Sequence, residues 1–260
     1  MSKIFHIGIL GAMPEEIGEI INHLKDIKEI IFGDLKILSG ELIQNSSQKK
    51  IFITTAWSGW GKVSASRATT RVLSQTFEGK SIDLLIFTGV AGSVNETLKQ
   101  WDIVIAQTLI QHDMDASPLY PKYVIPPINK MNIDASKTLV NWSENLFKQE
   151  VKSNKLKAFG QIVKGKVATG DQFISDNKKL IKLKEEIPNL DAVEMEGAAV
   201  AQVAYQEKIP WLIIRVISDS ADNDASQIFE EFLKKYEKES WNIISVLLNN
   251  LPDLEKFSLK

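Results

Sequence analysis

The spacing of apolar runs along the chain constrains its fold more than any other feature. Short runs rich in Ile, Leu and Val recur from residue 4 to residue 217, and segments with helical periodicity lie between several of them. The clearest run is WLIIRVI at residues 211–217, which is typical of a strand buried on both faces. Strands that alternate with helices predict parallel pairing and an α/β fold.

The apolar runs predict strands at Ile4–Leu10, Ile51–Trp57, Leu84–Thr88, Ile103–Gln107, Ile162–Ala168 and Trp211–Ile217. Helical periodicity predicts helices at Glu15–Leu24, Gly61–Leu73, Ala135–Phe147, Lys178–Glu186 and Phe229–Leu248. Two short apolar runs around Gly33-Asp34 predict a hairpin over Ile30–Leu42. An antiparallel hairpin beside parallel strands predicts a mixed sheet.

Length and the absence of internal repeats predict a single domain over residues 1–260. One stretch, Gln111–Lys130, is irregular and carries four prolines. Long loops are usually either functional or disordered. Because Tyr120 and Tyr123 are interleaved with the prolines, we expect this loop to be ordered and packed.

Composition excludes several classes of partner. The chain has no cysteine, which excludes a disulfide framework and fits a reducing compartment. Its net charge of −2, with acids and bases interspersed, argues against nucleic acid or an anionic membrane as the main partner. The apolar start runs into an acidic segment, and no run reaches the length of a membrane span. We therefore expect a cytoplasmic protein.

Several carboxylates stand beside segments that are otherwise apolar. Glu194 and Glu196 precede an Ala-rich helical run, Asp219 follows WLIIRVIS, and Glu16 follows the first strand. Each acid alone is explained as a helix or turn cap. Acids or glycine turns nevertheless lie at the C-terminal ends of nearly every predicted strand, where the open sheets of α/β proteins place their ligands. A shared cleft explains the whole set.

Two glycine-containing segments, Ser58–Lys62 and Phe87–Ser93, are expected to turn directly after strands. Glycine there allows either a tight turn or close approach of the backbone to a ligand. Neither segment has the spacing of a dinucleotide or triphosphate fingerprint. His112, Asp113 and Asp115 are too few for a convincing metal site, so we expect no metal and no cofactor.

Taken together, the motifs resemble one enzyme group. They are GAMPEE, SGWGK, TGVAGS, GDQF, VEMEGAAVA and RVISDSAD. They resemble the nucleoside phosphorylase and nucleosidase superfamily, and most of all the bacterial 5′-methylthioadenosine/S-adenosylhomocysteine nucleosidases. The resemblance implies a three-layer α/β/α sandwich around a mixed, mostly parallel sheet, and a homodimer. It also implies hydrolysis of the N-glycosidic bond of one or both nucleosides, with release of adenine and a 5-thioribose product.

The resemblance also implies roles for single residues. Asp219 would protonate or hydrogen-bond adenine N7, and Glu16 would act as base toward the attacking water. Glu196 would hold the ribose hydroxyls, with Met195 packed against the sugar. Arg215 matches an arginine near the water and the acids, and the resemblance places it among the substrate-binding residues. Charge develops on both ribose and base during cleavage, which agrees with these roles.

The remaining contacts implied by the resemblance involve the base and its surroundings. Phe173 would stack on the purine, and the Ile174 backbone would bind its edge. The residues of TGVAGS expected beside the substrate are Val90, Ala91 and Gly92.

The chain departs from the best-known relatives at three places. Trp60 replaces a smaller apolar residue, and Val90 replaces a serine. The Asp115–Pro127 loop differs from the loop that, in the family, reaches across the dimer to cover the 5′ substituent. Our hypothesis is that Trp60 and this loop shape the 5′ pocket.

Three rival functions remain open: a purine nucleoside phosphorylase, a nucleosidase for another adenosine-like nucleoside such as aminodeoxyfutalosine, and a nucleoside-binding protein without catalysis. A phosphorylase holds phosphate, usually with arginines or lysine. Arg67 and Arg71 lie four residues apart and are typical of an exposed pair, and Glu16 would repel phosphate. Hydrolysis is favoured, and the three acids argue against a binding protein.

Overall fold

The computed structural model describes residues 4–43, 49–221 and 225–254. Its centre is a ten-stranded mixed sheet. The strands are β1 (Ile4–Gly11), β2 (Leu24–Phe32), β3 (Leu35–Leu42), β4 (Lys50–Trp57), β7 (Leu84–Ser93), β8 (Ile103–Gln111), β9 (Asn132–Asp134), β10 (Ile162–Thr169), β11 (Leu190–Glu194) and β12 (Trp211–Asp219). A separate pair consists of β5 (Thr76–Phe77) and β6 (Lys80–Ser81).

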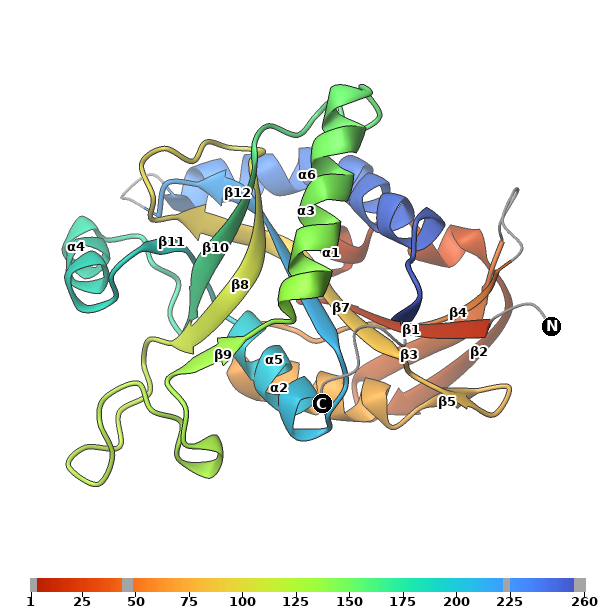
Figure 1. Ribbon diagram of the computed structural model, residues 1–260, viewed down its shortest axis with the longest axis horizontal. Coiled ribbons are helices and arrows are strands. Elements are labelled where there is room, and N and C mark those ends of the chain that lie inside the picture. Colours follow the sequence, from red (N-terminus) through yellow and green to blue (C-terminus); the bar gives the residue numbers. More distant parts are fainter. Residues whose placement is uncertain (1–3, 44–48, 222–224, 255–260) are drawn as a thin grey trace.

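Helices cover the sheet on both sides. They are α1 (Pro14–Ile17), α2 (Lys62–Leu73), α3 (Lys137–Lys152), α4 (Asn177–Glu186), α5 (Gly197–Gln206) and α6 (Ala225–Asn249), with short 3-10 turns η1 (Ile20–His23) and η2 (Pro126–Ile128). In Figure 1, α2 and α5 lie together below the sheet, and α1, α3 and α6 lie above it. The predicted three-layer α/β/α sandwich is confirmed.

The strand order is β11-β10-β8-β12-β7-β1-β4-β3-β2, with β9 added to β8. Parallel neighbours, such as β1 with β4 and β7, adjoin antiparallel ones, such as β12 with β8. The strand β11 also pairs with β7, through Ala192 opposite Ser93 and Val193 opposite Gly92. This pairing closes β7, β12, β8, β10 and β11 into a ring, so that strands far apart in sequence end beside one another.

The apolar runs predicted as strands are all confirmed, and the hairpin predicted over Ile30–Leu42 is formed by β2 and β3. Every residue of β12 is buried, which confirms a strand covered on both faces. The glycine turn predicted in Phe87–Ser93 is wrong. This segment continues β7 to Ser93, because β12 and β11 supply hydrogen-bond partners along its whole second half.

The helix predicted over Glu15–Leu24 is also wrong in its extent. The α1 helix ends at Ile17, and Leu24 already belongs to β2. Gly18 follows with a φ of 57°, and a Cβ on it would lie 2.3 Å from the Ser240 hydroxyl. Gly18 therefore breaks the helix and lets α1 pack closely on α6.

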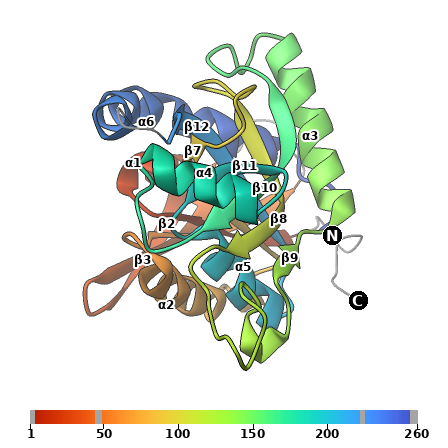
Figure 2. The same cartoon turned by 90° about the vertical axis from the view of Figure 1, so that its left-hand side faces the viewer.

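The loop after β8 is packed at Tyr123, as predicted, whereas Tyr120 is exposed. Tyr123 is buried, packs in a cluster with Ile174, and donates its hydroxyl hydrogen to Glu186. Figure 2 shows this loop extending below the sheet beside α5. Within the described residues, no helix combines the length and apolar character needed to cross a bilayer.

Candidate active site

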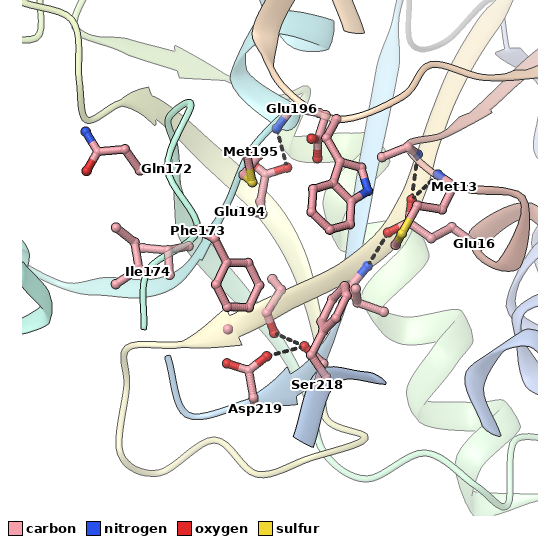
Figure 3. A pocket seen from close by; sticks show the side chains of 17 residues that line it. Met13, Glu16, Gln172, Phe173, Ile174, Glu194, Met195, Glu196, Ser218 and Asp219 are labelled. Carbon is pink, nitrogen blue, oxygen red and sulfur yellow. Dashed lines mark hydrogen bonds between the residues drawn. The ribbon is translucent and has the colours of Figure 1, made fainter. Parts of the chain in front are cut away.

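A pocket that opens to solvent lies where several strands of the sheet end. The described residues that line it are Ala12, Met13, Glu16, Trp60, Val90, Ala91, Gly92, Gln172, Phe173, Ile174, Val193, Glu194, Met195, Glu196, Ser218, Asp219 and Phe229. They come from the ends of β1, β7, β11 and β12, from loops after β4 and β10, and from α1 and α6 (Figure 3). The closed ring of strands brings these segments together.

Glu16 is fixed in the pocket wall by backbone donors. Its Oε2 accepts hydrogen bonds from the N–H groups of Ala12 (2.5 Å) and Met13 (3.1 Å), and its Oε1 accepts one from Val90 (3.0 Å). Only 2% of the residue is exposed. Burial raises the pKa of the Glu16 carboxyl, although Arg215 and the three N–H donors oppose that rise. A raised pKa makes this carboxylate a stronger base.

The structure corrects the expected substrate contact of Arg215. Its side chain is fully buried and does not line the pocket. Its guanidinium forms an ion pair with Glu194, lies 3.9 Å from Glu196 Oε2, and stacks over the Phe87 ring at 4.1 Å. Arg215 therefore acts on the site through the acids in front of it.

Gly89 leaves the space in which Arg215 approaches Glu16. A Cβ on Gly89 would lie 2.3 Å from both Arg215 Nη1 and Glu16 Oε1. No side chain fits there without displacing one of the two groups. Glycine at this position of β7 is thus part of how the site is built.

Glu196 precedes α5, and its side chain faces the pocket (Figure 3). Its Oε1 accepts a hydrogen bond from the Gly61 N–H at 2.7 Å. Burial, followed by the negative charges of Glu194 and Glu16, raises the pKa of Glu196 to about 8, and Arg215 opposes this rise. The single Arg215 guanidinium therefore acts electrostatically on three carboxyl groups, those of Glu194, Glu196 and Glu16.

Glu194 has partners that the sequence did not reveal. It pairs with Arg215 and accepts a hydrogen bond from the Thr169 hydroxyl, and it also accepts the N–H groups of Gly197 (2.7 Å) and Glu196 (3.2 Å) at the start of α5. Capping is thus only part of its role.

Asp219 ends β12 on another side of the pocket from Glu16 (Figure 3). Its Oδ1 accepts the Ala221 N–H at 2.8 Å, and the Ser218 hydroxyl donates to its Oδ2 at 2.6 Å. These bonds fix the direction of the carboxyl group. Asp222, the last residue of the RVISDSAD motif, lies outside the described residues.

Three aromatic side chains form an apolar wall of the pocket. The Phe229 ring packs edge-to-face on Phe173, with centroids 5.6 Å apart, and on Trp60, with centroids 6.3 Å apart. Phe173 and Trp60 remain 37% and 54% exposed, which leaves them surface for a ligand. Aromatic faces of this kind accept flat, apolar groups.

The structure brings the predicted site residues into this one pocket, except Arg215. It also adds residues that sequence reasoning missed: Ala12, Met13, Gln172, Val193, Ser218 and Phe229. Five of these lie within the recognised motifs, so their position in the sequence was a usable signal. Phe229 gave no such signal, because only the packing of α6 places it here. The described pocket contains no residue of the Asp115–Pro127 loop.

Among the residues that the structure describes, no group of three or more His, Asp or Glu side chains is arranged to hold a metal ion. His112 is buried with its ring against Gly170, and its imidazole pKa is lowered, chiefly by burial.

Comparison with known proteins identifies relatives of this chain. The sequence matches the Phosphorylase superfamily over residues 6–249. A 5′-methylthioadenosine/S-adenosylhomocysteine nucleosidase of Staphylococcus epidermidis is 33% identical over 245 residues, which cover 94% of this chain and all of the relative.

Solved structures agree as well. The nucleosidase of the same name from Neisseria meningitidis, in complex with methylthio-immucillin-A, superposes with a TM-score of 0.81 at 29% identity, covering 95% of this chain and 99% of that one. Futalosine hydrolase of Helicobacter pylori superposes with a TM-score of 0.78 at 32% identity, covering 95% and 98%. The chain belongs to the phosphorylase superfamily and, within it, to the 5′-methylthioadenosine/S-adenosylhomocysteine nucleosidase family.

Proposed function

We propose that this protein hydrolyses the N-glycosidic bond of 5′-methylthioadenosine, S-adenosylhomocysteine or both, releasing adenine and the 5-thioribose product. One observation carries the proposal: Glu16, Glu196 and Asp219 line a single pocket together with the exposed ring of Phe173. These are the groups needed to hold a ribose and a purine and to act on the bond between them.

On the base side, Phe173 stacks on the purine and the Ile174 backbone binds its edge. Asp219 hydrogen-bonds or protonates N7, which relieves the negative charge that develops on the leaving base. Its orientation suits this role, because the Ala221 N–H and the Ser218 hydroxyl hold the carboxyl group in place. Gly92, Ala91 and Val90 form the adjacent wall.

On the sugar side, Glu196 accepts hydrogen bonds from the ribose hydroxyls and Met195 packs against the ring. Glu16 removes a proton from the attacking water. Its raised pKa brings it toward the range in which a general base works best near neutral pH. The carboxylates also stabilise the positive charge that develops on the ribose as the bond breaks.

The charges at the pocket favour water over phosphate as the nucleophile. The described residues that line it include four acids and no Lys or Arg. Arg67 is exposed and pairs with Asp34 at 2.7 Å, while Arg71 packs over the Phe32 ring at 4.4 Å. Both arginines therefore contact residues other than the acids that line the pocket. A phosphate dianion would meet repulsion where a phosphorylase needs a cation.

Futalosine hydrolase as a structural neighbour keeps one alternative open, a nucleosidase for a related nucleoside with a different 5′ group. The same base and sugar contacts serve both classes, so Trp60 and the apolar wall around it decide between them. A cytoplasmic homodimer, with the Asp115–Pro127 loop of one copy covering the 5′ group in the other, stays a prediction.

The test is to incubate the pure protein with methylthioadenosine, S-adenosylhomocysteine, inosine and a futalosine analogue, with and without phosphate, and to measure the free base. We expect adenine from the first two substrates at rates independent of phosphate. Release that requires phosphate would establish a phosphorylase. Tight nucleoside binding without any free base would establish a binding protein.

A further inference from the structure

A closed set of hydrogen bonds lies beside the pocket and is formed by Lys62, Asp113 and Asp171, which we call the tripartite ring. Lys62 Nζ donates to Asp113 Oδ1 at 2.6 Å, and the Asp171 N–H donates to Asp113 Oδ2 at 2.9 Å. The Lys62 N–H donates in turn to Asp171 Oδ1 at 2.7 Å. Each residue is thus bonded to the other two, although none of them lines the pocket.

The tripartite ring joins three segments that are distant in sequence. Lys62 begins α2, Asp113 follows β8, and Asp171 follows β10. The side chains of Lys62 and Asp113 are each only 18% exposed, so their ion pair is partly shielded from water. Burial alone would raise the pKa of Asp113, but Lys62 and the Asp171 N–H hold it below its usual range. The ring therefore keeps Asp113 charged at neutral pH.

The tripartite ring adjoins, on two sides, groups that we assign to substrate binding. On the sugar side, the residue before Lys62 is Gly61, whose N–H holds Glu196 Oε1 at 2.7 Å. On the base side, Asp171 is followed within three residues by Phe173 and Ile174, which line the pocket. A change in the tripartite ring would shift the sugar-side contact of Glu196 relative to the base-side contacts of Phe173 and Ile174.

We propose that Lys62, Asp113 and Asp171 are positioning residues that hold the Glu196 contact and the Phe173 loop at the spacing required by one nucleoside. This inference rests on the proposed function, because it concerns the same pocket. Contacts that bind two ends of one ligand lose their combined effect when their spacing changes. Hydrogen bonds that do not involve the tripartite ring hold Glu16 and Asp219 in place. The tripartite ring should therefore affect substrate binding more than proton transfer.

Matched substitutions at Asp171 separate the hydrogen bond from other effects. Asp171→Ala removes the acceptor for the Lys62 N–H, whereas Asp171→Asn keeps a carbonyl oxygen there. We expect the alanine variant to raise KM for methylthioadenosine by about tenfold or more with a smaller change in kcat, and the asparagine variant to stay within about threefold of wild type. Lys62→Met should resemble the alanine variant.

The control for Lys62→Met is Lys184→Met, which breaks an ion pair with Glu96 between two residues that do not line the pocket, and it should leave KM unchanged. A double-mutant cycle adds a second readout: in a Phe173→Ala background, Asp171→Ala should cost much less than it does alone, because the contact it positions is already gone. Thermal unfolding of each variant verifies its fold, and Lys62→Met serves if Asp171→Ala does not fold.

Unchanged KM in both Asp171→Ala and Lys62→Met would overturn the inference, as would an asparagine variant as impaired as the alanine one. Failure of the proposed function has a different signature, because wild-type protein would then release no adenine from methylthioadenosine or S-adenosylhomocysteine in the absence of phosphate. In that case, the affinity for adenine, measured by calorimetry, would still test whether the tripartite ring positions the binding contacts. Equal affinity in wild type and Asp171→Ala would contradict it.

Discussion

At the scale of single residues, the site places several carboxyl groups around one buried guanidinium. Arg215 has no contact with solvent and faces Glu194, Glu196 and Glu16. Burial raises the pKa of both Glu16 and Glu196, the neighbouring carboxylates raise that of Glu196 further, and Arg215 opposes both shifts. Such a cluster costs folding stability, and enzymes commonly accept that cost at a functional site.

Replacing Glu196 by glutamine tests this balance. The pKa of Glu196 in the folded protein, about 8, lies above its reference value of 4.5, so the folded state binds a proton more tightly than the unfolded state. Stability is therefore lost as pH rises from 4.5 through 8. Glutamine cannot ionise and can still accept the Gly61 N–H. We expect Glu196→Gln to bind substrate more weakly and to unfold at least about 2 °C above wild type at pH 8.5, but not at pH 5.

The control for Glu196→Gln is Glu185→Gln, an exposed glutamate on α4. Its unfolding temperature should follow that of wild type at both pH values. A Glu196→Gln advantage that is the same at pH 5 and pH 8.5 would contradict the assigned pKa.

Gly89→Ala tests the approach of Arg215 to Glu16. The new methyl group would overlap both side chains and displace one of them, at a cost of about 1–3 kcal/mol in the free energy of unfolding. We expect kcat for base release to fall by about 10²-fold, because Glu16 loses its position. In a Glu16→Gln background the added loss in kcat should be small. A full additional loss there would show that Gly89 acts elsewhere.

At the scale of elements, short apolar runs were sufficient to predict most strands, because the apolar residues that a buried strand needs lie next to one another in the sequence. The α1 segment was predicted too long, since nothing local announces that Gly18 packs against α6. The strand β11 was missed because its five residues lie directly before the Ala-rich helix. Glycines and acids after predicted strands indicated a shared cleft, and the motif resemblance then identified the site residues. Phe229 was missed because only tertiary packing places it.

The turn between β4 and α2 carries one of the three departures from the best-known relatives. Trp60 lines the pocket and packs on Phe229. We expect Trp60→Ile to enlarge the 5′ side and to change the ratio of kcat/KM for S-adenosylhomocysteine over methylthioadenosine by at least about threefold, while adenine affinity stays the same. Trp57→Ile alters an exposed tryptophan at the end of β4 that does not line the pocket, and it should leave the ratio unchanged. An unchanged ratio in Trp60→Ile would remove Trp60 from the 5′ pocket.

At the scale of the whole molecule, the sandwich and its mixed sheet follow from the alternation of strands and helices. The pairing of β11 with β7 does not, because it joins residues about 100 positions apart in a contact only two residue pairs long. That closure brings the ends of β7, β11 and β12 together, and with them Gly92, Glu194 and Asp219. The resemblance of motifs identified these residues, and the closed ring of strands explains why they meet.

The central claim is that Glu16 and Asp219 act on one glycosidic bond from different sides of the pocket. The most direct measurement is single-turnover release of adenine from methylthioadenosine by wild type, Glu16→Gln and Asp219→Asn, each verified by circular dichroism. We expect both variants to keep the fold and to lose at least about 10²-fold in rate, since each proton-transfer role contributes about 10²–10⁴-fold. Near-normal adenine release by either variant would contradict the claim.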